Sequence, residues 1–282
     1  MRLAVIDGRA VVVRGDRAAD VGWASRGRLS TDPMALLEQW QRVRDWGGEL
    51  SDEAYDISVD PEALQAPVPR PRQVFAIALN YPPHAAEAGY TPPAEPLVFT
   101  KFPACLTGPH TTVALPPGKV DWEVELVAVI GRETYRASED HAWESVAGLT
   151  VGQDLSERVS QLQGKPAQFS LGKSFPGFGP TGPVLVTPDE FEDPGDLEIT
   201  GLLNGRVVQH DRTKSMIFPV PELIARLSAV LPLFPGDLIF TGTPAGVGNR
   251  MDPPRYLTPD DELLSRIEGI GEIRQHFTAA HP

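Results

Sequence analysis

Three acidic residues alternate with apolar ones in the segment of residues 121–127. Neighbouring side chains of an extended strand point to opposite faces, so Asp121, Glu123 and Glu125 are expected on one face. Carboxylates at this spacing repel one another, and a bound cation relieves the repulsion. Because every available ligand atom is an oxygen, a hard ion such as Mg²⁺, Mn²⁺ or Ca²⁺ fits. The alternative is a strand whose acidic face is exposed to water.

A further carboxylate, Asp154, follows the strand-like run of residues 148–153 and can complete this metal site. Its alternative role is to cap the first turn of a helix. Arg158 and Gln161 are three residues apart and share one helix face, which offers a guanidinium to a substrate carboxylate and an amide to a carbonyl. An exposed polar helix face explains these two residues equally well.

A histidine and a glutamate lie one helical turn apart in the segment of residues 80–87. Asn80 and the prolines after it can begin a short helix that places His84 and Glu87 on one side. A carboxylate that orients a histidine makes the imidazole a better base for activating water. The alternative is an exposed ion pair without a catalytic role.

Two loops that contain glycine offer groups for anions. Lys173 follows Gly172, but the segment is not a phosphate-binding loop because Ala167 stands where that loop requires a glycine. Lys173 is still placed to reach an anionic substrate, and its alternative is an ordinary loop lysine. The loop that begins at Gly242 and Thr243 offers backbone N–H groups and a hydroxyl to a carboxylate, or it is a tight structural turn.

Short strands must position most of these residues. One helix is expected from the Asp32 cap to Gly47 and Gly48, and another between Pro221 and Pro232. Strands without alternating long helices disfavour a doubly wound sheet and predict a β-rich α+β fold. We expect a small N-terminal β/α domain with a linker at residues 1–70 and a larger domain at 71–282. The strands are expected at residues 3–13 as a hairpin, 124–130, 184–187, 197–203, 207–208 and 238–241.

The composition narrows the class of protein. The 282 residues include 25 Lys and Arg against 38 Asp and Glu, a net charge of −13 without any basic run, so a nucleic-acid partner is not expected. The single cysteine, Cys105, fits a reducing compartment. No apolar stretch approaches the roughly 20 residues that a membrane span needs. We therefore expect a cytoplasmic protein that binds neither membranes nor nucleic acid.

In their order along the chain, these motifs resemble the fumarylacetoacetate hydrolase family, in particular its small bacterial acylpyruvate hydrolases and 2-hydroxyhepta-2,4-diene-1,7-dioate isomerases. The resemblance covers roughly residues 70–277 and implies a mixed β-roll catalytic domain that is usually a homodimer. The segments that carry the resemblance are residues 79–87, 121–126, 154–161, 172–175, 242–248 and 267–271.

The resemblance also implies roles for the residues. Asp121 matches no ligand position in the small bacterial members, whereas three other carboxylates match ligands of Mg²⁺ or Mn²⁺, with Ca²⁺ as a substitute in crystals. The implied metal ligands are Glu123, Glu125 and Asp154; the implied catalytic residues are His84, Glu87, Lys173 and Gln161; the implied substrate-binding residues are Arg158, Thr243, Gly242 and Tyr81.

The implied activity is that of a hydrolase acting on carbon–carbon bonds in ketonic substances. It cleaves acylpyruvate-type 2,4-dioxo acids such as fumarylpyruvate or acetylpyruvate, a chemistry typical of aromatic compound catabolism. A metal-stabilised enolate equally serves oxaloacetate decarboxylation and the isomerisation or lysis of unsaturated 2-oxo acids, so these stay alternatives. The remaining alternative is a structural or regulatory relative that binds a metal but has no enzymatic activity.

Overall fold

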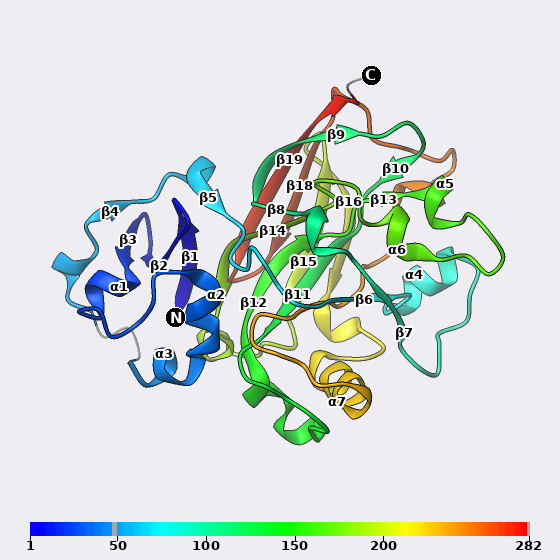
Figure 1. Cartoon of the computed structure of the whole chain (residues 1–282). Coiled ribbons are helices and arrows are strands. Elements are labelled where there is room, and N and C mark those ends of the chain that lie inside the picture. Colours follow the sequence, from blue (N-terminus) through cyan, green and yellow to red (C-terminus); the bar gives the residue numbers. More distant parts are fainter. Residues whose placement is uncertain (47–49, 281–282) are drawn as a thin grey trace.

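The computed structural model describes residues 1–46 and 50–280 (Figure 1). Twelve strands of this described part form one mixed sheet, in which β17 and β6 are parallel, as are β14 and β8, and the other paired strands are antiparallel. In spatial order the sheet contains β4 (Ile57–Ser58), β3 (Arg17–Asp20), β2 (Arg9–Arg14), β1 (Arg2–Ile6), β14 (Gly179–Val186), β12 (Val146–Gln153), β11 (Val124–Ile130), β17 (Leu238–Phe240), β6 (Val74–Ala78) and β7 (Leu97–Thr100), with β5 (Leu64–Gln65) beside β1 and β8 (Leu106–Thr107) beside β14.

Two smaller sheets complete the β structure. A sheet of five strands packs against the central strands of the large sheet. A separate pair of two-residue strands contains Asp121, the first residue of the acidic segment 121–127. This arrangement of mixed sheets with few helices confirms the β-rich α+β fold that the sequence predicts. The five-stranded order is β16 (Arg206–Arg212), β15 (Glu198–Leu203), β18 (Glu262–Ile267), β19 (Gly271–Ala279) and β9 (His110–Leu115), and the pair is β10 (Val120–Asp121) with β13 (Ser156–Glu157).

The N-terminal strands extend the large sheet. The expected hairpin is present, and its turn places Asp7 at φ 50° and Gly8 at φ 73°, the left-handed region that a two-residue turn of this kind requires. Strand β1 pairs antiparallel with β14, with Arg2 opposite Val186. The N-terminal strands therefore share a sheet with strands of the larger region.

The helices are short and lie around the sheets. The helix expected from Asp32 to Gly47 and Gly48 is two helices interrupted at Gln39; Asp32 caps the first, and residues 47–49 lie outside the described residues. The helix expected between Pro221 and Pro232 is confirmed as α7. The helices are α1 (Val21–Ala24), α2 (Pro33–Glu38), α3 (Trp40–Trp46), α4 (Pro82–Glu87), α5 (Arg158–Gln161), α6 (Phe169–Gly172) and α7 (Val220–Val230).

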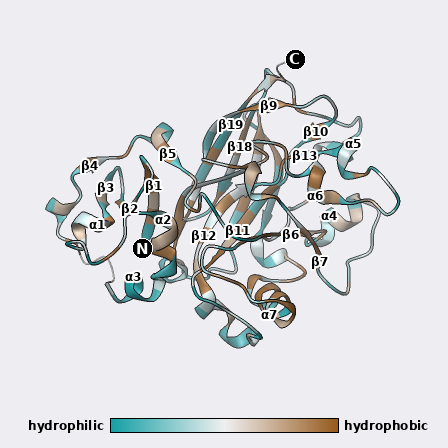
Figure 2. Cartoon of the chain, in the orientation of Figure 1, coloured by the Kyte–Doolittle hydropathy of each residue, from teal (hydrophilic) through white to brown (hydrophobic). Residues whose placement is uncertain are grey.

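Strand β11 runs through the centre of the hydrophobic core. All seven of its residues are buried, and Leu126, Ala128 and Ile130 pack toward the five-stranded sheet and α7 while Val127 and Val129 pack on the opposite face. Figure 2 shows hydrophobic residues along these central strands and α7. A strand packed on both faces provides a rigid base for the carboxylates at its N-terminal end. Among the described residues, none of the helices combines the length and hydropathy of a membrane-spanning segment.

Candidate active site

Three buried carboxylates meet where β11 begins and β12 ends. One side-chain oxygen from each of Glu123, Glu125 and Asp154 lies within 4.8 Å of the other two. The antiparallel pairing of β11 with β12 brings them together, and the Asp154 backbone N–H donates to the Glu123 carbonyl over 2.9 Å. Burial excludes the alternative of a water-exposed acidic face. Glu157, not Asp154, caps α5, which excludes the alternative of a helix cap for Asp154.

Each of the three carboxylates has one oxygen held by a donor of the protein. Such contacts fix the orientation of a ligand. The three pairs are Arg158 Nη2 to Glu123 Oε1 at 2.7 Å, Lys101 Nζ to Asp154 Oδ1 at 2.6 Å, and the Gly242 backbone N–H to Glu125 Oε2 at 2.8 Å.

Lys173 bridges the second oxygens of two of these carboxylates. Its Nζ lies 2.7 Å from Glu123 Oε2 and 2.7 Å from Asp154 Oδ2, and only 2% of the residue is exposed. Burial opposes both charges, but the cations Lys173 and Arg158 outweigh it and hold the pKa of Glu123 below its usual range. The same carboxylates outweigh burial at Lys173 and raise the pKa of its ammonium group.

The electrostatics of the cluster fit a divalent cation. Burial, together with the charges of Asp154 and Glu123, raises the pKa of Glu125 well above its usual range. A divalent ion held by these carboxylates would offset the repulsion part of this shift with its two positive charges. Three carboxylate oxygens are hard ligands that suit Mg²⁺ or Mn²⁺, so the residues present fit such an ion.

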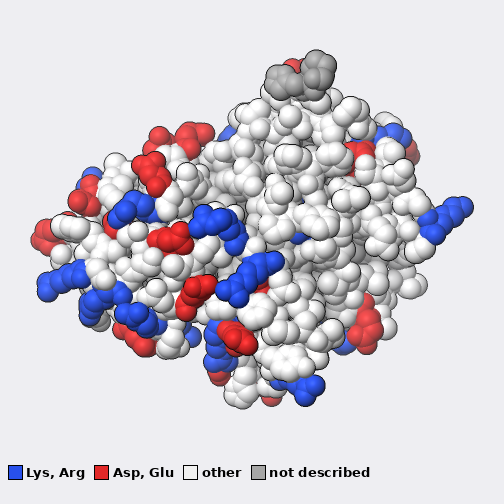
Figure 3. Space-filling view, in the orientation of Figure 1, with Lys and Arg blue, Asp and Glu red and all other residues white. Residues whose placement is uncertain are grey.

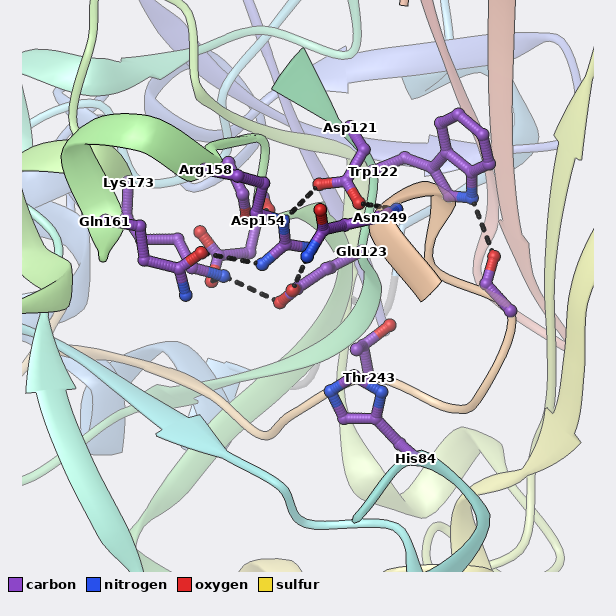
Figure 4. Close-up of polar contacts among 12 residues, drawn as sticks. His84, Asp121, Trp122, Glu123, Asp154, Arg158, Gln161, Lys173, Thr243 and Asn249 are labelled. Carbon is purple, nitrogen blue, oxygen red and sulfur yellow. Dashed lines mark hydrogen bonds and ion pairs between the residues drawn. The ribbon is translucent and has the colours of Figure 1, made fainter. Parts of the chain in front are cut away.

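Asp121 lies outside this cluster and holds Arg158. The strand expected through residues 121–127 is interrupted at Trp122 and Glu123, between β10 and β11, yet Asp121 and Glu123 both reach Arg158. Asp121 accepts from Arg158 Nε over 2.6 Å, and Arg158 Nη1 donates to Gln161 Oε1 over 2.8 Å (Figure 4). All three guanidinium nitrogens of Arg158 therefore already contact protein acceptors.

His84 and Glu87 form a hydrogen-bonded pair on α4. His84 Nδ1 lies 2.7 Å from Glu87 Oε1, and Glu87 Oε2 accepts from the Gly246 backbone N–H over 3.0 Å. Because an ionised Glu87 can only accept, the proton between them belongs to Nδ1, and the Nε2 lone pair of His84 is left as a base. The close-up places the imidazole below the Glu123 carboxylate (Figure 4).

Part of this site lines one cavity of about 210 Å³. A larger and more open hollow of about 710 Å³ lies beside the N-terminal strands and contains none of the predicted site residues. Six of the predicted site residues line the smaller cavity, whereas Glu87, Glu125 and Asp154 lie behind its lining; apolar side chains make up much of the rest. Its polar lining includes His84, Glu123, Arg158, Gln161, Lys173, Thr243, Asn249 and Arg250, and its apolar lining includes Ile77, Leu97, Phe99, Leu162, Phe169 and Val247.

Three residues near the cavity are held in structural contacts. Thr243 lines the cavity, but its hydroxyl donates to the Val124 carbonyl over 2.8 Å. Gly242 acts through its backbone N–H on Glu125 and is not part of the cavity wall. Tyr81 is fully buried in the core, where burial raises the pKa of its phenol, and it is also absent from the wall.

Lys101 belongs to the site although the sequence gives no local signal for it. The residue has no exposed surface, and besides Asp154 its Nζ donates to the backbone carbonyls of Lys173 and Phe178, the latter at 3.1 Å. One ammonium group thus connects a candidate metal ligand with the loop that carries Lys173.

Comparison with known proteins places this geometry in a family. The model of the fumarylacetoacetate (FAA) hydrolase C-terminal domain matches residues 73–278. The chain is 43% identical over 210 residues to the human mitochondrial oxaloacetate tautomerase FAHD2A, which covers 74% of this chain and 67% of the relative.

Comparison with solved structures supports the same family assignment. A Mycobacterium smegmatis protein provisionally assigned as HpcE superposes with a TM-score of 0.95 at 51% identity, covering 100% of both chains. Maleylpyruvate hydrolase from Sphingobium sp. SYK-6, in complex with manganese and pyruvate, superposes with a TM-score of 0.81 at 27% identity, covering 100% of both chains. The chain belongs to the fumarylacetoacetate hydrolase family, whose members include hydrolases, isomerases and tautomerases.

Proposed function

We propose that this protein is a metal-dependent hydrolase that cleaves a carbon–carbon bond in acylpyruvate-type 2,4-dioxo acids. The observation that carries the proposal is the His84–Glu87 pair, 2.7 Å apart, of which His84 lines the same cavity as Glu123. A base that activates water is needed for hydrolysis, and the carboxylate cluster supplies the second requirement, a site for a divalent cation.

Glu123, Glu125 and Asp154 would hold Mg²⁺ or Mn²⁺, in keeping with the manganese in the maleylpyruvate hydrolase structure. When bound, such an ion polarises the 2-oxo group and stabilises enolate character in the pyruvate portion of the substrate. Arg158 is the proposed partner of the adjacent carboxylate, and Thr243, whose hydroxyl donates to the Val124 carbonyl, would contribute to this position only by exchanging that contact. The fixed position of Arg158 keeps the substrate oriented in the cavity.

The residues of the chain then carry the proton transfers. Water adds its oxygen to the distal carbonyl carbon while Nε2 of His84 takes its proton. The bond between that carbon and the methylene breaks, which leaves a carboxylic acid and the enolate of pyruvate, and the enolate accepts a proton to become pyruvate. Lys173 and Gln161 are placed to donate to the oxygens on which negative charge develops.

Oxaloacetate tautomerisation or decarboxylation is the second candidate function, supported by the 43% identity to an oxaloacetate tautomerase. Tautomerisation needs only a base that moves a proton between carbon and oxygen, and His84 can also do this. Decarboxylation needs no attacking water. The isomerisation or lysis of unsaturated 2-oxo acids requires the same enolate stabilisation.

A substrate panel separates these activities. The protein, loaded with Mg²⁺ or Mn²⁺, is incubated with acetylpyruvate, fumarylpyruvate, oxaloacetate and an unsaturated 2-oxo diacid, and the products are quantified. The proposal predicts one pyruvate and one carboxylic acid for each acylpyruvate consumed. Turnover confined to oxaloacetate or to the unsaturated diacid would replace the hydrolase with the corresponding alternative, and no turnover of any compound would favour a non-enzymatic relative.

A further inference from the structure

Gln209 is a buried side chain that reaches the site from the five-stranded sheet. It lies on β16, only 1% of the residue is exposed, and it does not line the cavity. Its Oε1 accepts from the Val124 backbone N–H over 3.0 Å, and its Nε2 donates to Thr243 Oγ1 and to the Pro244 carbonyl, each over 2.8 Å. Because a backbone N–H can only donate and a carbonyl can only accept, these partners fix which way the amide points.

The contacts close a ring of hydrogen bonds around Val124, the residue between the candidate metal ligands Glu123 and Glu125. The Val124 N–H donates to Gln209, and Gln209 donates to Thr243. The Thr243 hydroxyl donates back to the Val124 carbonyl over 2.8 Å, which completes the ring. Two side chains thus hold both polar groups of this backbone position, and with them the directions in which the neighbouring glutamates leave the strand.

The ring lies where the pairing of β11 with β17 ends. The paired residues of β11 begin at Val127, and one further backbone bond reaches the Leu126 carbonyl. Val124, two residues earlier, is buried, so its N–H and carbonyl need partners inside the protein. Gln209 and Thr243 supply the bonds that a neighbouring strand would give. On this side of β11, the position of the ligand segment therefore depends on side chains.

The nitrogen end of the Gln209 amide holds the loop that supports the candidate base. Along this loop, the Gly246 backbone N–H donates to Glu87 Oε2 over 3.0 Å, and Glu87 Oε1 lies 2.7 Å from Nδ1 of His84. A Cβ atom at Gly246 would clash with the Val208 carbonyl oxygen, so the loop rests directly on β16 beside Gln209. The amide therefore lies between the ligand segment and the loop that supports the base.

Building on the metal site of the proposed function, we propose that Gln209 is a positioning residue that fixes the candidate metal ligands and the His84–Glu87 pair relative to each other. A base must lie within hydrogen-bond reach of the water that it activates, so a displacement of about 1 Å between the two groups slows turnover. Gln209 lies outside the cavity wall and acts through Val124 and the loop. A buried amide that only stabilises the fold would affect neither metal affinity nor turnover of the folded protein.

The test compares two buried glutamines of the five-stranded sheet. Gln209→Met keeps the approximate length of the side chain and removes the three hydrogen bonds of the amide. Gln275→Met makes the same change on β19, where Gln275 has no exposed surface, donates to the Pro109 carbonyl over 2.9 Å and does not line the cavity. Urea denaturation defines the conditions in which both variants are folded. Gln275→Met then reports the loss of a buried amide outside the site.

Calorimetric titration with Mn²⁺ measures the arrangement of the ligands without any substrate. We expect Gln209→Met to bind Mn²⁺ about 10-fold more weakly than the wild type, the loss typical when a group that orients a metal ligand is removed, and Gln275→Met to match the wild type. Three results overturn the inference: unchanged Mn²⁺ affinity in Gln209→Met, equal weakening in both variants, or no Mn²⁺ binding by the wild type.

Turnover at saturating Mn²⁺ tests the link to the base and keeps this inference separate from the hydrolase. With the 2-oxo acid that the wild type converts, kcat of Gln209→Met should fall about 10-fold to 100-fold with a smaller change in KM, and Gln275→Met should keep the wild-type kcat. An undiminished kcat in Gln209→Met overturns the inference. Weaker Mn²⁺ binding by Gln209→Met, beside a wild type that hydrolyses no acylpyruvate, sustains the inference and refutes the hydrolase.

A second variant opens the same ring from the loop. Thr243→Val keeps the shape of the side chain but removes the hydroxyl between Gln209 and the Val124 carbonyl. Because either change breaks one ring, the fold losses in Mn²⁺ affinity of Gln209→Met and Thr243→Val should not multiply in the double variant. Losses that multiply overturn the inference. If Gln209→Met does not fold, Thr243→Val is compared with Gln275→Met instead: about 10-fold weaker Mn²⁺ binding is expected, and unchanged binding overturns the inference.

Discussion

The Lys101 ammonium group donates to Asp154 Oδ1 over 2.6 Å in a place where neither side chain has any exposed surface. Two further acceptors, the carbonyls of Lys173 and Phe178, complete its three hydrogen bonds. A buried charge is tolerated only where it is paired and hydrogen-bonded in this way. Lys101 therefore links the carboxylate cluster to the loop that carries Lys173.

Replacing Lys101 with methionine should destabilise the protein strongly. The substitution keeps most of the side-chain volume but leaves Asp154 Oδ1 and the carbonyls of Lys173 and Phe178 without their buried donor, although Lys173 still contacts Asp154 Oδ2. Breaking a buried pair costs about 3–5 kcal/mol. We expect a loss of this size in the free energy of unfolding, measured by urea denaturation without metal. A loss below about 1 kcal/mol would show that water or another group replaces Lys101.

Lys173→Met should separate metal binding from catalysis. The Lys173 ammonium group contacts oxygens of Glu123 and Asp154, two of the proposed metal ligands, so its removal takes a competing positive charge from the site. We expect Mn²⁺ to bind at least as tightly as to the wild type in a calorimetric titration, while acylpyruvate turnover falls at least about 100-fold. Weaker Mn²⁺ binding would mean that Lys173 supports the ligands instead of competing with the ion.

The carboxylate cluster should make thermal stability depend on a divalent cation. At a free Mn²⁺ concentration about 100 times its Kd, binding adds about 2.7 kcal/mol and should raise Tm by several degrees, an effect that a chelator reverses. Glu125→Gln has nearly the same shape, retains an acceptor for the Gly242 N–H, and removes one ligand charge. In this variant Mn²⁺ should raise Tm much less than in the wild type. An equal rise in Tm for wild type and Glu125→Gln would mean that the ion binds elsewhere.

An exposed apolar face next to the cavity should form the predicted homodimer. Leu171 on α6 is 71% exposed, and Val98 on the edge strand β7 and Phe102 just after it are each 48% exposed. Figure 3 shows few charges over the part of the molecule that carries α6 and β7. We expect the wild type to be a dimer in light scattering and Leu171→Glu to be a monomer. Val230→Glu, at a 77% exposed position on α7, is the matched control and should stay dimeric. A monomeric wild type would refute the predicted homodimer.

The residues that the sequence could locate are those with short-range spacing. His84 and Glu87 are three residues apart on a helix, and Glu123 and Glu125 are two apart at the start of a strand, so local geometry alone brings each pair together. Asp154 joins them through the pairing of two long buried strands, which their apolar runs predict.

The residues that the sequence could not locate depend on contacts between distant segments. Lys101 lies 53 positions from Asp154 and follows an edge strand, and nothing in its neighbours predicts that a lysine there is buried. Alternation groups Asp121 with Glu123, and both do contact Arg158, but Asp121 is also held by the Asn249 backbone N–H and does not join the carboxylate cluster. Such contacts are set by packing, which a periodic pattern does not encode.

The most direct test of the proposed hydrolase compares wild type with His84→Asn, both saturated with Mn²⁺, on an acylpyruvate. Asparagine preserves a polar side chain but offers no base at the Nε2 position, whereas the metal ligands are untouched. We predict that the wild type forms equal amounts of pyruvate and carboxylic acid and that His84→Asn, with Mn²⁺ still bound, is slower by about 10²-fold to 10⁴-fold. Undiminished carbon–carbon cleavage by His84→Asn, or none by the wild type, would contradict the proposed mechanism.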